Sequence, residues 1–153
     1  MASRVRAPPT GRGMSAPVFI SYNFRDDKEF ARGIRNFFQP FGPCHGVPHF
    51  VENDVSERGL EAIDAEIRSV MSGCVAAVFV CGQNTHDSPW INREAKLAIS
   101  RNLGIVVLRA PGSTGGIPNE LRALTTPPPL VDWGPEHLCS EINRIVSARG
   151  SNR

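Results

Sequence analysis

Residues 75–81, VAAVFVC, are the most hydrophobic run of the chain. An uninterrupted apolar run of this length, rich in valine, predicts a strand that is buried on both faces. Strands of this kind belong to parallel sheets, in which consecutive strands need a crossover connection that is usually a helix. We therefore expect strands and helices to alternate along the rest of the chain.

Further apolar runs predict strands, and segments with helical periodicity separate them. The expected strands are residues 17–22, 47–52, 104–110 and 130–133. The expected helices are residues 27–38, residues 60–71, one that begins at Pro89, one or two turns within residues 118–124, and one that begins at Pro135. This order predicts an α/β fold, a flavodoxin-like three-layer sandwich around a five-stranded parallel sheet in the order 2-1-3-4-5.

The length of 153 residues predicts a single domain. We expect a flexible basic arm over residues 1–16, the domain over residues 17–148 and a flexible tail over residues 149–153. Five arginines lie in these two ends, and without them the net charge of +2 becomes −3, so we expect no nucleic-acid partner. The sequence has no long apolar run and no apolar segment near its start, and we expect a cytoplasmic protein without a membrane partner.

The four cysteines contain no C-x-x-C pair, and their spacing does not predict a disulfide framework. Cys44, His45 and His49 are three possible zinc ligands. No second cluster of ligands completes a tetrahedral site, and we expect no metal.

The loops that follow the first and third expected strands hold a dense set of polar and aromatic residues. Sheets with this strand order bind ligands beyond the carboxyl ends of the strands, where the order reverses. Here that point lies between YNFRDD, residues 22–27, and CGQNTHDS, residues 81–88. Ser88 is a good helix N-cap with Pro89 after it, and Glu94 falls on the same side of the helix as Trp90.

This crevice suits a nucleotide better than an apolar metabolite. Its amides and hydroxyls match ribose or phosphate oxygens, the start of a helix favours an anion, and Phe24 and Trp90 are suited to stack on a base. The candidate catalytic residue is Glu94. The candidate substrate-binding residues are Ser21, Tyr22, Asn23, Phe24, Arg25, Asn84, Thr85, His86, Ser88 and Trp90.

Simpler interpretations of these residues remain open at this point. Glu94 is also explained as an exposed residue that pairs with Arg93, Lys96 or Arg101, Trp90 as core, and His86 as solvent-exposed. Asp26 or Asp27 is placed to cap a helix. Asn53 and Asp54 are either loop caps or ribose contacts.

Other sites common in this architecture are absent from the sequence. Cys81 and Gly82 stand where a response-regulator receiver needs an aspartate. The sequence contains no G-x-G-x-x-G, G-x-x-x-x-G-K-[ST] or G-x-S-x-G motif, which argues against dinucleotide-binding, P-loop and serine-hydrolase sites.

Two segments resemble the TIR-domain superfamily. VFISYNFRDD, residues 18–27, is similar to the first conserved box of TIR domains, and SPWINRE, residues 88–94, is similar to their third-helix pattern, in which a tryptophan precedes the catalytic glutamate by four positions. GQNTHDSPW, residues 82–90, resembles the G-x-x-T-x-x-S-x-W run of TIR-like proteins of the ThsB type from Thoeris anti-phage systems. The resemblance covers residues 17–147, but residues 47–59 do not carry the usual second box.

The resemblance implies an NAD glycohydrolase or ADP-ribosyl cyclase type of enzyme. Such proteins cleave the N-glycosidic bond of NAD, release nicotinamide and make a cyclic or conjugated signalling nucleotide that activates an effector protein. NAD is the substrate, and no cofactor is implied. Glu94 would stabilise the positive charge that develops on the ribose. Asn84, Thr85 and Ser88 would position ribose or phosphate, and Tyr22, Phe24 and Arg25 would line the opposite wall, with Arg25 paired to the pyrophosphate.

Two other functions fit the same sequence. A non-catalytic TIR adaptor or nucleotide-sensing module would act through protein contacts, including association of copies of the chain. A nucleoside deoxyribosyltransferase would cleave nucleosides and leave NAD intact.

Overall fold

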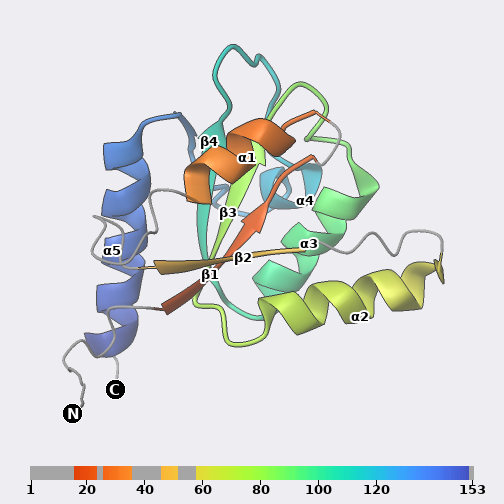
Figure 1. The fold of residues 1–153 in the computed structure, drawn as a ribbon, viewed down its shortest axis with the longest axis horizontal. Helices are drawn as coiled ribbons and strands as arrows, with labels where there is room; N and C mark the ends of the chain where they lie inside the picture. Colours follow the sequence, from red (N-terminus) through yellow and green to blue (C-terminus); the bar gives the residue numbers. More distant parts are fainter. Residues whose placement is uncertain (1–15, 24–25, 36–45, 52–57, 152–153) are drawn as a thin grey trace.

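The computed structural model describes residues 16–23, 26–35, 46–51 and 58–151. Its centre is a five-stranded parallel sheet in the order β2-β1-β3-β4-β5 (Figure 1). The strands are β1 Ala16–Ser21, β2 Gly46–Phe50, β3 Ala76–Cys81, β4 Gly104–Arg109 and β5 Leu130–Asp132. This confirms the predicted fold class and strand order.

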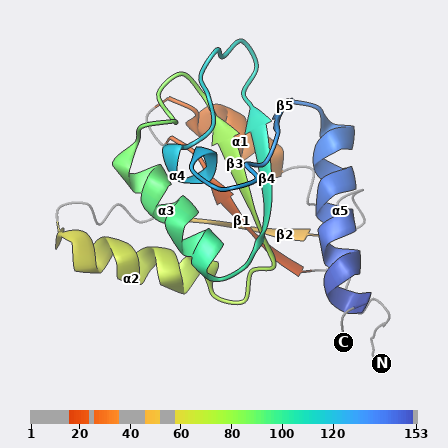
Figure 2. The same ribbon diagram turned by 180° about the vertical axis from the view of Figure 1, so that it is seen from behind.

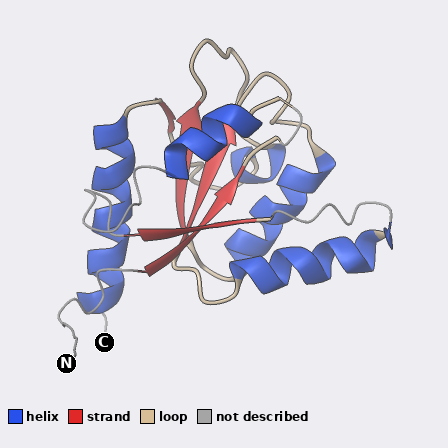
Figure 3. Cartoon of the chain, in the orientation of Figure 1, coloured by secondary structure: helices blue, strands red, loops and turns tan. Residues whose placement is uncertain are grey.

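Helices cover both faces of the sheet. They are α1 Lys28–Ile34, α2 Leu60–Met71, α3 Pro89–Ser100, α4 Asn119–Arg122 and α5 Pro135–Ser151. α1 and α5 pack on one face, whereas α2, α3 and α4 pack on the other, so that two separate hydrophobic clusters form (Figures 1 and 2). Every segment predicted to be a helix or strand contains one (Figure 3).

β3 is buried over its whole length, as its uninterrupted apolar sequence predicts. Its side chains alternate between the two clusters: Val78 and Val80 lie with α1 and α5, whereas Phe79 and Cys81 lie with α2, α3 and α4. Burial raises the pKa of the Cys81 thiol to about 12, which keeps it an apolar packing group at neutral pH. The alternation also assigns each residue near the end of a strand to one face.

Every strand differs from its predicted bounds by one or two residues, and two helices differ as well. β1 begins at Ala16, within the expected arm. α1 is described over Lys28–Ile34 between its cap residues Asp27 and Arg35, and residues 36–38 of the expected helix lie outside the described residues. α5 continues to Ser151, beyond the expected boundary at residue 148, because the apolar spacing of a helix does not specify where its last turn ends.

Cys139 on α5 is disulfide-bonded, which corrects the expectation from the cysteine spacing. Spacing along the chain does not reveal which thiols the fold brings within bonding distance. In the described part of the chain, no helix is long and apolar enough to cross a membrane.

Candidate active site at the carboxyl ends of β1 and β3

The candidate site lies where β1 and β3 end side by side. β1 ends at Ser21, which is paired with Phe79, and β3 continues to Cys81. Residues 82–88 then form the loop that leads into α3. β2 lies on one side of β1 and β3 lies on the other, so the direction in which the chain adds strands reverses at β1. In sheets of this topology, ligands bind at such points.

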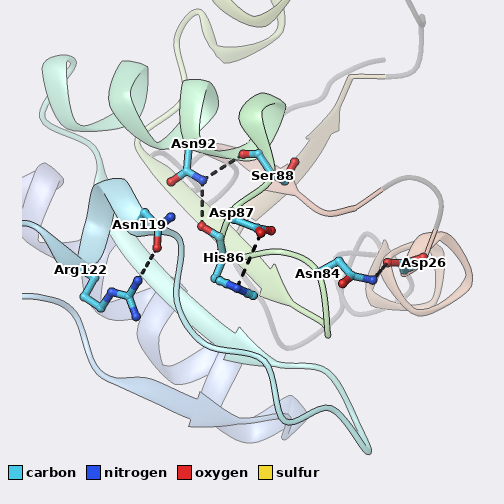
Figure 4. Close-up of polar contacts among 8 residues, drawn as sticks. All are labelled: Asp26, Asn84, His86, Asp87, Ser88, Asn92, Asn119 and Arg122. Atoms are coloured by element: carbon cyan, nitrogen blue, oxygen red, sulfur yellow. Dashed lines mark hydrogen bonds and ion pairs between the residues drawn. The ribbon is translucent and has the colours of Figure 1, made fainter.

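Ser88 fixes the start of α3, as the sequence predicts. It is the N-cap residue, and its Oγ accepts a hydrogen bond of 3.3 Å from the backbone N–H of Ile91. The Asn92 side chain adds a second restraint, because its Nδ2 donates to the carbonyl oxygens of His86 and Ser88, both at 2.9 Å (Figure 4). The loop and the first turns of α3 are therefore held together.

Glu94 points from α3 toward the end of β1 and is only 3% exposed. Its Oε1 accepts a hydrogen bond of 2.6 Å from the Ser21 hydroxyl, and its Oε2 accepts one of 3.2 Å from the indole Nε1 of Trp90. The interpretation of Glu94 as an exposed residue paired with a neighbouring cation is therefore wrong. Arg93 instead forms an ion pair of 3.1 Å with Asp64 on α2.

Burial dominates the protonation of Glu94. It raises the pKa of the carboxyl to about 8, while the hydrogen bonds from Ser21 and Trp90 act in the opposite direction because they stabilise the charged form. At pH 7, roughly one tenth of such a group is ionised. A cation placed next to the carboxyl would favour its ionised form.

Thr85 organises the loop from within. It has no exposed surface, and its Oγ1 accepts a hydrogen bond of 2.8 Å from the Gly82 N–H and donates one of 3.3 Å to the Val80 carbonyl. Asn84 projects outward, and its Nδ2 donates to Oδ2 of Asp26 at 2.8 Å (Figure 4). Asn84 thus connects this loop to the start of α1, and the Thr85 hydroxyl is used inside the loop.

The start of α1 differs from the predicted cap. Asp27 stands at the N-cap position, but its side chain makes no capping hydrogen bond. The Asn23 side chain stabilises the turn before the helix instead, since its Oδ1 accepts a bond of 3.1 Å from the Asp26 N–H. The Asp27 carboxyl turns toward Gly82 and is 9% exposed, and burial, with the nearby charge of Asp26 as a second cause, raises its pKa.

The segment between β4 and β5 forms hydrogen bonds with the β3–α3 loop and with α3. Oε1 of Gln83 accepts bonds of 2.6 Å and 3.0 Å from the N–H and hydroxyl of Thr114. Oδ1 of Asn92 accepts a bond of 2.8 Å from the N–H of Glu120 in α4. These contacts of Gln83 and Asn92 are not predictable from the sequence, because no periodicity predicts contacts with the irregular segment before β5.

Two further candidates, Tyr22 and His86, contact residues other than Glu94. Tyr22 lies on the opposite face of the sheet, with its ring edge-on to Phe50 at 5.9 Å between centroids. His86 is half-exposed and lies 3.9 Å from the Asp87 carboxylate, measured from Nε2 (Figure 4). The predicted residues Phe24, Arg25, Asn53 and Asp54 lie outside the described residues.

The proposed zinc ligands are only partly covered by the structure. His49 lies in β2, whereas Cys44 and His45 are outside the described residues. Among the residues that the structure does describe, no three histidine, cysteine or acidic side chains gather as a metal site would require.

Comparison with known proteins supports the resemblance found in the sequence. Residues 19–115 match the family described as "Thoeris protein ThsB, TIR-like domain". Among solved structures, the TIR domains of the activated Roq1 resistosome directly recognizing the pathogen effector XopQ are similar over 86% of this chain and 84% of that chain, with 13% sequence identity and a TM-score of 0.46. No curated protein gives a match. The family match spans more than half of the chain and includes the loop and helix that carry Trp90 and Glu94, and the chain therefore belongs to the ThsB TIR-like family.

Proposed function

We propose that this protein cleaves the N-glycosidic bond of NAD and converts the ADP-ribosyl group into a cyclic or conjugated signalling nucleotide for anti-phage defence. The observation that carries the proposal is the carboxyl of Glu94. It is buried near the carboxyl ends of β1 and β3, and each of its oxygens accepts a hydrogen bond, from Ser21 and from Trp90. Membership of the ThsB TIR-like family supports the same function.

The reaction needs only one carboxylate. The bond between the ribose anomeric carbon and the nicotinamide ring nitrogen breaks, and its electron pair neutralises the positive ring nitrogen. Nicotinamide therefore leaves without a proton from a general acid, unlike the leaving groups of most glycosidases. The anomeric carbon becomes positively charged, and an ionised Glu94 beside it would stabilise that charge most strongly in a site with little water.

The buried state of Glu94 is compatible with this role. Without a ligand the neutral carboxyl is favoured, because burial raises its pKa to about 8. The cationic nicotinamide ring of NAD would favour ionisation when it binds beside the carboxyl. The charge of Glu94 would thus form together with the complex that uses it.

The acceptor of the ADP-ribosyl group determines the product. Attack by water gives ADP-ribose, whereas attack by a hydroxyl or ring nitrogen of the same nucleotide gives a cyclic product, and a second molecule gives a conjugate. The low exposure of Glu94 disfavours water next to the reacting carbon. The product would then bind an effector protein, and NAD would be the substrate without any further cofactor.

The test follows nicotinamide release from NAD by the purified full chain, by chromatography, with the nucleotide products identified by mass spectrometry. Glu94→Gln keeps the size of the side chain and removes its charge, and we expect it to reduce release by about 100-fold or more. Glu61→Gln is the matched control, because Glu61 is exposed on α2. Glu94→Gln with wild-type activity and an unchanged melting temperature would contradict the assignment.

A binding experiment separates the enzyme from the other two functions. If NAD binds to the wild-type protein but is never cleaved, a nucleotide-sensing role replaces the enzyme. If nucleosides are cleaved and NAD is not, the protein is a nucleoside deoxyribosyltransferase. Binding of NAD to the purified full chain is measured by calorimetry, and cleavage of NAD or of nucleosides is followed by chromatography.

A further inference from the structure

Ser21 was predicted to bind substrate, but its side chain is almost fully buried, with 1% of the residue exposed. It is the last residue of β1, where its pairing with Phe79 of β3 fixes the backbone. On strand alternation it lies on the same face as Phe19, the face that α3 covers. The Ser21 hydroxyl is directed at the Glu94 carboxyl, so it acts on that side chain.

We infer that Ser21 is a positioning residue, which holds the carboxyl of Glu94 in its reactive orientation without contacting NAD. The inference rests on the proposed function and adds a residue to it. The carrying observation is the hydrogen bond of 2.6 Å between the Ser21 hydroxyl and Oε1 of Glu94, which joins the sheet to α3.

The two donors to Glu94 restrain it in different ways. Trp90 lies one helical turn before Glu94 on α3, so its bond to Oε2 moves with the helix. Ser21 belongs to β1, and its bond therefore fixes the carboxyl relative to the carboxyl ends of the strands. A glutamate side chain has three rotatable bonds, and holding both oxygens removes rotations that would turn the carboxyl away.

The hydroxyl also affects protonation, because a donated hydrogen bond stabilises a carboxylate more than a neutral carboxyl. Burial has the largest effect on the pKa of Glu94 and raises it. The hydrogen bonds from Ser21 on β1 and Trp90 on α3 lower it. The charged groups at the α2–α3 contact, Arg93 and Asp64, are bonded to each other. Removal of the Ser21 hydroxyl should therefore raise the pH at which Glu94 ionises.

The first test does not depend on enzyme activity. The protein is labelled with carbon-13 at the glutamate carboxyl, and the Glu94 resonance is assigned by its loss in Glu94→Gln and titrated by NMR from pH 5 to pH 10. We expect Ser21→Ala to raise the titration midpoint by about one pH unit. Ser100→Ala is the control, because Ser100 lies on the same helix and its hydroxyl bonds to the Leu97 carbonyl instead.

The second test measures kcat/KM for NAD against pH, since this ratio reports the ionisation of the free enzyme. In Ser21→Ala we expect the acidic limb to move to higher pH, so that kcat/KM falls by more than about 10-fold at pH 7 and by less above pH 9, where the lost restraint still keeps it below the wild-type plateau. A role in folding alone would lower activity equally at every pH. Ser100→Ala should follow the wild-type profile.

The outcomes separate this inference from the proposed function. An unchanged midpoint in a folded Ser21→Ala protein overturns the positioning role, whether or not NAD is cleaved. A raised midpoint in a protein that leaves NAD intact supports the restraint on Glu94 and contradicts the proposed function. If Ser21→Ala does not fold, Ser21→Thr keeps the hydroxyl and should keep the wild-type midpoint, and a displaced midpoint would then overturn the inference.

Discussion

At the scale of single residues, Gly82 shows why the site loop has its composition. A Cβ at this position would lie 2.7 Å from Cγ of Asp27, and closer still to the two carboxyl oxygens. The close approach of the Asp27 carboxyl therefore requires glycine here, and Gly82 does not have a left-handed backbone. The first residue after β3 and the residue before α1 therefore lie close together.

Gly82→Ala should destabilise the protein by about 1–3 kcal/mol, because the added methyl group must displace the Asp27 carboxyl or the loop. The measurement is the free energy of unfolding in urea. Gly116→Ala is the control, because a Cβ at Gly116 meets no atom within 4 Å. In an Asp27→Ala background the same change at Gly82 should cost much less, and an equal cost in both backgrounds would show that the contact is not its cause.

At the scale of elements, α3 is the helix whose position matters most for the site. Its start depends on Ser88 as N-cap and on the two bonds from Asn92 to the preceding loop. Pro89 has no N–H, and the N–H of Ile91 is occupied by Ser88, so that these two amides are not available to a ligand. The beginning of the helix thus serves chiefly to hold Glu94 in place.

Ser88→Ala should lower the free energy of unfolding by about 1 kcal/mol, which is the usual cost of losing an N-cap side chain. Hydrogen exchange should show the loss first at the amide of Ile91, whose acceptor is removed. Ser69→Ala, at an exposed position on α2, is the matched control and should not lower stability. Unchanged exchange at Ile91 in Ser88→Ala would contradict the capping role.

The elements themselves were predictable because each has a local signal. Apolar runs predicted all five strands, and apolar periodicity together with Ser88-Pro89 predicted the helices. The candidate site was assigned from the sequence down to its loops and to Glu94, and that assignment stays a prediction. The partner of Glu94 was not predictable, because the bond joins residues 73 positions apart and depends on side-chain geometry. The contact of Gln83 was not predictable for the same reason, since its partner Thr114 lies in a segment without periodicity.

At the scale of the whole molecule, Glu94 links the site to global stability. The sheet and its two hydrophobic clusters form a core in which Ser21, Asp27, Thr85 and Glu94 are the buried polar residues among those described. The pKa of Glu94 is about 8 in the folded protein, and about 4.3 is usual in an unfolded chain. Folding therefore favours the protonated carboxyl, and the site is maintained at the expense of stability at neutral and alkaline pH.

The sign of the resulting pH dependence follows from proton binding. Between pH 4.3 and pH 8 the folded state binds more protons at Glu94 than the unfolded state, so the free energy of unfolding falls as the pH rises through this range. The contribution is fully present below the unfolded pKa and is lost above the folded one, a change on the order of 5 kcal/mol. Asp27, whose pKa is also raised, acts in the same direction.

Urea unfolding of the wild type and of Glu94→Gln at intervals from pH 4 to pH 9 measures this contribution. Asp27 and the other titrating groups are common to both proteins and cancel in the difference. The wild type should lose stability relative to Glu94→Gln as the pH rises, and the difference should become constant above about pH 8. Two parallel curves would mean that Glu94 ionises at similar pH in the folded and unfolded protein, which would contradict the buried position of its carboxyl. A difference that grows as described, together with loss of nicotinamide release in Glu94→Gln, would place the cost in stability and the proposed catalytic role on the same side chain.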